Sequence, residues 1–410
     1  MIALATLVAI APLAAGDWPW WRGPKRDGCS TDQGLLSEWP AGGPPLPWKA
    51  TGCGVGYSGV SVVGERLFTM GDGPDGSHVL AFDVKSGRLV WRSALVGKRG
   101  GDPAGTRSTP SVDGGCVYAL GQYGDLVCLN AATGREFWRR SLTRDFGGRY
   151  HDWLYAESPL VDREKVAVTP GGQRGAIVAL NRRTGALLWQ STEFKDPAHY
   201  SSLIAADIDG VRQYIQLTTE SVAGVAADNG RLLWRVNRRG VTAVVPTPVY
   251  ADHQVYVTSG YGVGCQAFRI AGEAGGFKAE PVYANQVMVN HHGGVVLLAG
   301  YVYGHSDSKG WVCQDFKTGA VVWSHHGVGK GSLCYADGHL YLRSEGGSGT
   351  LALVEASPKA YVEKGRFEQP DRSDKNCWAH PVVANGRLYL RDQDVLLCYD
   401  VKKRQVKRET

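Results

Sequence analysis

Methionine and long apolar runs are scarce in this sequence of 410 residues, and several common catalytic and phosphate-binding motifs are missing. Only 3 residues are Met, and after Gly16 no stretch approaches the roughly 18 apolar residues of a membrane-spanning helix. The sequence has no Walker loop, no Gly-x-Ser-x-Gly motif and no His-Glu-x-x-His motif. It therefore gives no sign of a P-loop, a serine-hydrolase elbow or a zincin site, and we expect the mature chain not to span a membrane.

Glycine and tryptophan, in contrast, are abundant. The 55 Gly residues are about twice the usual share of roughly 7%, and there are 13 Trp. The glycines follow no collagen-like period, and each Gly inside a helix disfavours it by about 1 kcal/mol. With 43% apolar residues, this composition predicts a folded chain of many strands joined by tight turns.

The charge is uneven along the chain. The formal net charge is +6, and the last ten residues, 401–410, contribute +4 of it as a basic tail. The body is therefore close to neutral and shows none of the basic stripes that nucleic-acid binding requires. We expect no nucleic-acid partner.

Residues 1–16 form a short apolar run that ends in small residues, with Ala14 and Gly16 before Asp17. This pattern is typical of a secretory signal peptide and is too short for a membrane-spanning helix. We expect an exported protein of the periplasm or cell envelope.

An internal repeat organises the rest of the chain. In its clearest copies an Asp or Asn is followed by Ser or Thr, then Gly, and a Trp four residues after the Gly. The Gly–Trp pairs are Gly87–Trp91, Gly134–Trp138, Gly185–Trp189, Gly230–Trp234 and Gly319–Trp323. Successive glycines lie 47, 51, 45 and 89 residues apart. The last gap is about two periods, so one copy is hidden between residues 234 and 319.

Short turns between apolar runs give the full number of units. They recur at Val63-Gly64, Asp113-Gly114, Asp162-Arg163, Asp209-Gly210, Asp252-His253, Ala299-Gly300, Asp337-Gly338 and Asn385-Gly386. Such pairs favour tight hairpins because both residues tolerate positive φ. Each unit of about 46 residues also holds a third and a fourth strand. The sequence predicts an all-β, eight-bladed β-propeller of four-stranded antiparallel blades over residues 46–400.

One position of each third strand is always small. It holds Ala81, Cys128, Ala179, Gly224, Ala267, Cys313, Ala352 and Cys398. We interpret the three cysteines there as small apolar residues in a blade that narrows towards the axis. A disulfide between Cys116 and Cys128, near-opposite on one hairpin, stays open as an alternative.

The chain ends predict how the ring closes. The eighth unit has no Gly-x-x-x-Trp, whereas Trp48 stands near the N-terminus without a preceding hairpin. We expect this N-terminal segment to supply the missing outer strand. The docking slots would then hold Trp48, Trp91, Trp138, Trp189, Trp234 and Trp323. Residues 17–45, with Trp18, Trp20 and Trp21, form an arm that either packs on the ring as a plug or binds a partner.

The repeat motif and the eight units resemble the pyrroloquinoline-quinone (PQQ) repeat, or quinoprotein-like, propellers. The opening Trp18-Pro-Trp-Trp-Arg-Gly-Pro-Lys-Arg-Asp-Gly28 is similar to the lead-in of exported members. The resemblance implies two functions: PQQ dehydrogenases use Ca²⁺, an Asp base and two adjacent bonded cysteines, whereas a subunit of the outer-membrane β-barrel assembly machinery binds proteins. This sequence has no adjacent cysteines and no Cys-x-x-Cys-His haem motif. No cofactor follows from the residues themselves, and PQQ with Ca²⁺ is implied by the resemblance alone.

Polar and aromatic residues gather in the connections that lead from each fourth strand to the next blade. Because these connections open on one face of the ring, we expect them to converge at the channel mouth. The candidate ligand-binding residues are Arg107, His151, Asp152, Glu157, His199, Tyr200, His291, His292, Lys330, Trp378 and His380. Trp153, Tyr155, Arg239, His325 and His326 belong to the same set of connections. We assign no metal ligands, although a three-histidine site with Glu157 is a sharper version of this hypothesis.

Two functions stay open from the sequence. The first is a monomeric binding or scaffold module of the cell envelope, with an envelope protein or a small molecule as its partner. The alternative is a PQQ-dependent or related oxidoreductase acting on alcohols or sugars. The missing cysteine pair favours the first.

Overall fold

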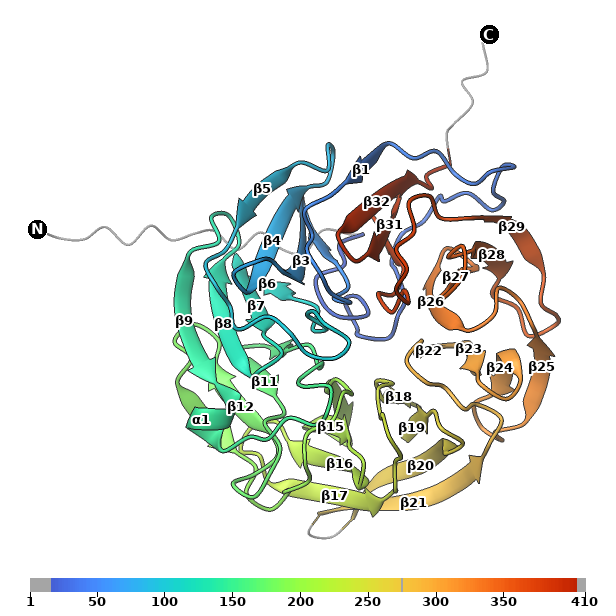
Figure 1. Ribbon diagram of the computed structural model, residues 1–410. Helices are drawn as coiled ribbons and strands as arrows, with labels where there is room; N and C mark the ends of the chain where they lie inside the picture. The colour runs from blue at the N-terminus through green and yellow to red at the C-terminus, as the bar shows by residue number, and fades with distance from the viewer. Residues whose placement is uncertain (1–15, 274–275, 404–410) are drawn as a thin grey trace, which may run out of the picture.

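The computed structural model describes residues 16–273 and 276–403, which form a ring of eight four-stranded antiparallel sheets around a central channel (Figure 1). The predicted all-β, eight-bladed propeller is confirmed. The proposed signal peptide, except for Gly16, and the basic tail beyond Lys403 lie outside the described residues. In the part of the chain that the structure describes, no helix is long and apolar enough to cross a membrane.

Blades 1 to 4 each follow the chain from the channel outwards. Blade 1 contains β2 (Ser61–Val63), β3 (Arg66–Asp72), β4 (Ser77–Asp83) and β5 (Leu89–Arg92). Blade 2 contains β6 (Ser111–Asp113), β7 (Cys116–Leu120), β8 (Asp125–Asn130) and β9 (Glu136–Ser141), followed by the short helix α1 (Leu142–Phe146). Blade 3 contains β10 (Leu160–Asp162), β11 (Lys165–Val168), β12 (Val178–Asn181) and β13 (Leu187–Gln190). Blade 4 contains β14 (Ile204–Ile208), β15 (Val211–Leu217), β16 (Ser221–Ala226) and β17 (Leu232–Asn237).

Blades 5 to 7 repeat this order, and blade 8 closes the ring. Blade 5 contains β18 (Val249–Ala251), β19 (Gln254–Ser259), β20 (Gly264–Glu273) and β21 (Gly276–Asn285). Blade 6 contains β22 (Val295–Leu298), β23 (Tyr301–Ser306), β24 (Gly310–Asp315) and β25 (Val321–His325). Blade 7 contains β26 (Gly331–Ala336), β27 (His339–Ser344), β28 (Leu351–Glu355) and β29 (Glu363–Phe367). Blade 8 contains β30 (Val382–Ala384), β31 (Arg387–Asp392), β32 (Val395–Asp400) and the N-terminal β1 (Trp48–Ala50).

The closing strand predicted from the N-terminal segment is confirmed. β1 pairs antiparallel with β32, and Trp48 lies opposite Cys398. One sheet is therefore assembled from both ends of the chain, which closes the ring and gives blade 8 the same four strands as the other blades.

The repeat Trp of one blade docks on the turn of the next. The indole N–H donates to a backbone carbonyl in that turn in five places: Trp48 to Val84, Trp91 to Ala131, Trp138 to Arg182, Trp189 to Ala227 and Trp323 to Ser357, at 2.9–3.2 Å. The motif glycine makes room for the ring. A Cβ on Gly185, for example, would lie 2.7 Å from Trp138, and the φ of +68° also favours glycine.

The expected role of Trp234 is only partly right, because it donates to Gln213 of its own blade at 2.7 Å. Blade 5, the hidden copy, extends its outer strands β20 and β21 to ten residues each in place of the short motif turn. Tyr283 of blade 5 takes the docking position on blade 6, where its hydroxyl donates to the Phe316 carbonyl at 3.0 Å and its ring lies against Gly319.

The third-strand residue is small because a Trp lies opposite it on the neighbouring strand, rather than because the blade narrows towards the axis. Ala81, Cys128, Ala179, Gly224, Cys313 and Cys398 each lie directly opposite the repeat Trp on the neighbouring strand. At Gly224 an added Cβ would lie 2.3 Å from the Trp234 ring nitrogen. All nine cysteines are free thiols, so the Cys116–Cys128 disulfide alternative is wrong in this structure.

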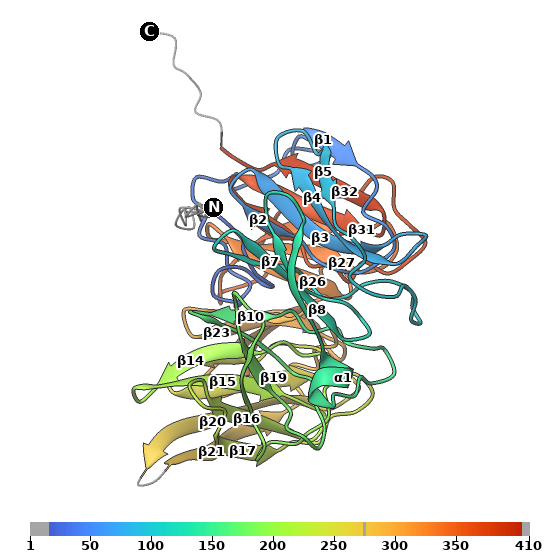
Figure 2. The ribbon, with the colours of Figure 1, turned by 90° about the vertical axis from the view of Figure 1, so that its left-hand side faces the viewer.

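The N-terminal arm packs on the ring, as the first of its two alternatives predicted. Seen from the side (Figure 2), the strands run between two faces of the ring. The arm crosses the face that carries the turns between the first and second strands of the blades. There Trp18 pairs with Val62 of β2, and Cys29 pairs with Tyr335 of β26. Trp18 is buried. The arm therefore links blades 1 and 7 across the channel.

Substitution of a docking Trp should lower the free energy of unfolding, and the loss should be greater when more of the side chain is removed. Trp138→Phe removes the bond to the Arg182 carbonyl and should cost about 1 kcal/mol, whereas Trp138→Ala should cost about 3–5 kcal/mol. The measurement is the free energy of unfolding in urea. Phe137→Ala is the matched control, because this neighbouring side chain is half exposed and should change stability by less than about 0.5 kcal/mol. Equal losses for Phe137→Ala and Trp138→Ala would contradict the docking role.

Candidate functional site

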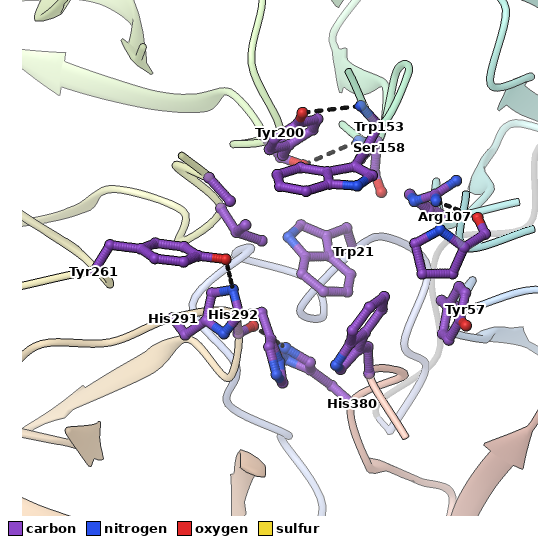
Figure 3. Close-up of a pocket in the computed structure, with 16 residues that line it drawn as sticks. Trp21, Tyr57, Arg107, Trp153, Ser158, Tyr200, Tyr261, His291, His292 and His380 are labelled. Carbon is purple, nitrogen blue, oxygen red and sulfur yellow. Dashed lines mark hydrogen bonds between the residues drawn. The ribbon is translucent and has the colours of Figure 1, made fainter. Parts of the chain in front are cut away.

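A cavity of about 340 Å³ occupies the channel mouth on the face opposite the arm (Figure 3). Its lining is largely aromatic and apolar. The residues that line it are Trp21, Tyr57, Pro103, Arg107, Trp153, Ala156, Ser158, Tyr200, Ser202, Ala243, Val245, Tyr261, His291, His292, Trp378 and His380. The volume lies within the range of about 300–1,000 Å³ that is usual for small-molecule sites.

Successive blades contribute to this cavity through the connections that precede their innermost strands. Tyr57 precedes β2, Arg107 precedes β6, and Tyr200 precedes β14. In four connections the lining residues alternate: Ala156 and Ser158, Tyr200 and Ser202, Ala243 and Val245, Trp378 and His380. Extended backbone points alternate side chains to opposite sides, so every second residue faces the cavity.

The floor of the cavity comes from the arm. Trp21 lies at the centre of the ring of side chains in Figure 3. Its indole N–H donates to the Thr247 hydroxyl at 3.0 Å, and its ring contacts His380 with centroids 4.7 Å apart. The arm thus places an aromatic surface under the mouth of the channel.

Six of the eleven candidate residues line the cavity: Arg107, Tyr200, His291, His292, Trp378 and His380. Five do not: His151, Asp152, Glu157, His199 and Lys330. Glu157 falls between the lining residues Ala156 and Ser158, and His199 directly precedes the lining residue Tyr200, so both occupy the alternate positions that point away from the cavity. His291 and His292 both line the cavity although they are consecutive, because they lie in a bend and not in a strand.

The five remaining candidates have structural partners. Glu157 is buried and accepts a bond from the Thr169 N–H, and burial raises its pKa to about 7. The His199 ring receives the Val244 N–H at 3.0 Å, and burial followed by the charge of His151 lowers the pKa of His199 to about 4. His151 contacts the Tyr200 hydroxyl at 3.2 Å and lies 3.6 Å from the exposed Asp152, while Lys330 pairs with Asp307 at 3.0 Å.

Three histidines form one wall of the cavity, and each is held through Nε2. His291 pairs with the Tyr261 hydroxyl at 3.0 Å, His292 pairs with the Glu345 carboxylate, and His380 donates to the His292 carbonyl at 3.0 Å. Glu345 also accepts the Trp378 indole N–H at 3.2 Å. These bonds fix the ring orientations and turn the polar edges towards the protein.

The charge of this wall is low. Burial, and then the charges of His292 and Lys330, lower the pKa of His291 to about 4. Burial, and then Arg22, lower the pKa of His380 to about 3. Both rings are therefore neutral at pH 7.

Arg107 is the one guanidinium of the lining. It is bonded to the carbonyls of Gly105, at 2.9 Å, and Pro103, and lies 5.9 Å from the centre of the Tyr57 ring. Among the described residues it forms no ion pair with a carboxylate, so some N–H groups of its guanidinium stay available to a ligand. Burial lowers the pKa of Arg107. A guanidinium is basic enough to stay charged at neutral pH.

The cavity does not supply the ligands that PQQ with Ca²⁺ would need. Ca²⁺ prefers six to eight oxygen ligands, commonly carboxylates, and among the described residues no Asp or Glu lines the cavity. Within residues 16–273 and 276–403, no cluster of three His, Cys, Asp or Glu side chains could hold a metal ion, so the three-histidine hypothesis is wrong.

Sequence reasoning missed Trp21, Tyr57, Pro103, Ala156, Ser158, Ser202, Ala243, Val245 and Tyr261. The alternation within each connection could have found several of them. Tyr261 lies in the turn between β19 and β20, outside those connections. Trp21 lies about 130 residues or more from most of the wall, and the sequence offered a packed arm as one alternative but did not show which of its tryptophans reaches the cavity.

Acidification should destabilise the protein through the neutral histidines. In the folded protein His380 has a pKa of about 3, whereas in the unfolded chain it takes up a proton below pH 6.5. The stability that comes from a neutral His380 is therefore present above pH 6.5 and is lost as the pH falls towards 3. By pH 5 this costs about 2 kcal/mol. His380→Gln should reduce the loss between pH 7 and pH 5 by this amount in urea unfolding. The exposed His326→Gln is the control, and equal pH profiles for the two variants would argue against a buried neutral His380.

Comparisons with known proteins agree on the fold. The outer membrane protein assembly factor BamB of Kangiella koreensis is 26% identical over 230 residues, which cover 53% of this chain and 50% of the relative. The crystal structure of BamB from Moraxella catarrhalis has a TM-score of 0.64 at 16% identity and covers 88% of this chain and 99% of that one. Quinohemoprotein alcohol dehydrogenase from Comamonas testosteroni has a TM-score of 0.65 at 12% identity, with 98% and 83% covered.

The two solved structures show a shared fold. The sequence match spans about half the length of the curated relative. A family model described as "Outer membrane protein assembly factor BamB" matches residues 75–325, more than half of the chain. The chain therefore belongs to this family of PQQ-like repeat β-propellers.

Proposed function

We propose that this protein is an exported binding module of the cell envelope, and that its ligand site is the aromatic cavity at the channel mouth. The relatives named as outer membrane assembly factors support an envelope location, and the apolar run at residues 1–16 supports export. The observation that carries the proposal is the cavity itself, which combines six aromatic Trp and Tyr side chains with one unpaired guanidinium.

The lining indicates the chemistry of the ligand. The flat faces of Trp21, Trp153 and Trp378 favour an apolar or aromatic body. Arg107 favours a carboxylate, because charge-assisted bonds to a guanidinium are the stronger kind, and no lining carboxylate opposes it. A small organic anion with an aromatic body therefore fits best.

The oxidoreductase alternative gains no support from the site. An alcohol dehydrogenase shares the fold, but at 12% identity this says nothing about chemistry. The cavity also lacks a carboxylate to act as a base or to bind Ca²⁺.

Phenylacetate should bind in this cavity and quench tryptophan fluorescence, whereas the uncharged phenylacetamide should bind at least about tenfold more weakly, because it forms no charge-assisted bond with Arg107. Ala156→Trp fills the cavity and should abolish binding without changing any charge, whereas Ala186→Trp on an exposed turn should leave it intact. Isothermal titration calorimetry gives the affinities. Absence of saturable phenylacetate binding, or equal binding by both Trp variants, would overturn the assignment.

Addition of PQQ with Ca²⁺ should produce no dye-linked oxidation of alcohols or sugars. The physical reason is the absence of carboxylate ligands in the lining. Stoichiometric PQQ binding with turnover would establish the alternative function instead.

A further inference from the structure

A second cavity lies on the opposite face of the ring, between the arm and the hairpin turns of blades 2, 3 and 4. Its volume is about 460 Å³. The arm contributes Trp20, Lys25 and Arg26, and the blades contribute Leu160 and Arg163 among others. We call it the arm groove. It shares no lining residue with the mouth cavity.

The arm groove carries an excess of positive charge. Five basic side chains line it against two acidic ones, Asp113 and Asp162. Arg182 pairs with Asp113, and Arg212 pairs with Asp162 at 3.0 Å. These two arginines also pair with Glu164 and Asp207 outside the lining, so their charges are already balanced.

Three cations remain without an ion pair among the described residues: Lys25, Arg26 and Arg163. Lys25 and Arg163 are exposed. Lys25 interacts with Asp27 only through space. The two form the accessible positive rim of the arm groove.

Arg26 provides an independent sign of a missing anion. It is 4% exposed, and its two terminal nitrogens donate to the carbonyls of Pro159 and Ser158 at 3.0 and 2.8 Å. Its Nε is buried without a partner. The carboxyl that acts on it through space is Glu157, whose pKa burial raises to about 7, so neutralisation of Arg26 at pH 7 is incomplete.

The arm groove also offers apolar contact. Trp20 is half-buried, and its indole N–H is already bonded to the Val112 carbonyl at 3.1 Å, which leaves the ring to pack. Leu160 and Val161 also line the groove but are buried, so Trp20 provides the more accessible apolar surface. A ligand for this groove therefore combines negative charge with an apolar side chain.

We propose that the arm groove binds an acidic segment of a partner polypeptide, with carboxylates at Lys25 and Arg163 and an apolar side chain against the ring of Trp20. The carboxylates of Asp113 and Asp162 disfavour a polyphosphate backbone, whose dense charge would approach both. The near-neutral body of the chain likewise lacks the extended basic face of nucleic-acid binding. This site is separate from the mouth cavity and does not depend on the function proposed for it.

Fluorescence anisotropy of two labelled peptides tests the proposal. The probe is Asp-Glu-Phe-Glu-Asp and its matched control is Asn-Gln-Phe-Gln-Asn. The acidic peptide should bind saturably to the full chain, at least about tenfold more tightly than the amide peptide, and more weakly as salt rises from about 0.05 to about 0.5 M.

Charge reversal should locate the binding. Lys25→Glu with Arg163→Glu should weaken binding of the acidic peptide at least about tenfold. Lys317→Glu with Lys359→Glu, an equal charge change on exposed lysines of blades 6 and 7, should change it less than about twofold. Equal urea midpoints for the two double variants show that both fold.

Three results would overturn the proposal: no saturable binding of the acidic peptide, equal affinity for the two peptides, or equal weakening by the two double variants. A single-stranded DNA that outcompetes the acidic peptide would also count against it. Because phenylacetate binding reports only on the mouth cavity, failure at one site is distinguishable from failure at the other.

Discussion

The contact between an aromatic ring and a glycine of the next blade is the interaction on which the ring depends. In blades 8, 1, 2 and 3 a Trp donates its indole N–H into the following turn and covers the motif glycine there. The contact needs three features together: a left-handed glycine without a Cβ, a free backbone carbonyl, and a small residue opposite the Trp on the neighbouring strand. Each feature occupies a defined place in the repeat, so the repeat pattern in the sequence directly specifies the contact between neighbouring blades.

Blade 5 shows that the docking geometry matters more than the residue type. Tyr283 replaces Trp, and its hydroxyl reaches the same kind of carbonyl that an indole N–H reaches elsewhere. Gly319 still accommodates the ring. Trp234, although it has the motif spacing, bonds within its own blade because the turn that it would cover is replaced by a long ribbon.

The ring in turn determines which side chains meet at the mouth. Eight similar blades direct their entry segments towards one axis, so residues far apart in sequence become neighbours. Half of each extended segment faces inwards, and this places Ser158 at the cavity and Glu157 in the protein interior. The candidate list from the sequence included residues that face the cavity and residues that face the interior. The sequence does not show which of two alternating positions faces the cavity, because this depends on how each blade is oriented in the ring.

The sequence alone determined the blade number, the strand pairing within blades, the docking Trp positions other than Trp234, and the closure by Trp48. These depend on local periodicity and turn chemistry, which repeat and can be read residue by residue. The tertiary structure alone decided that Trp21 forms the floor of the mouth, that Arg26 is buried and bonded to the carbonyls of Ser158 and Pro159, and that Arg107 faces an aromatic cavity. These depend on a single arm crossing a closed ring, an event without a repeat and therefore without a pattern in the sequence.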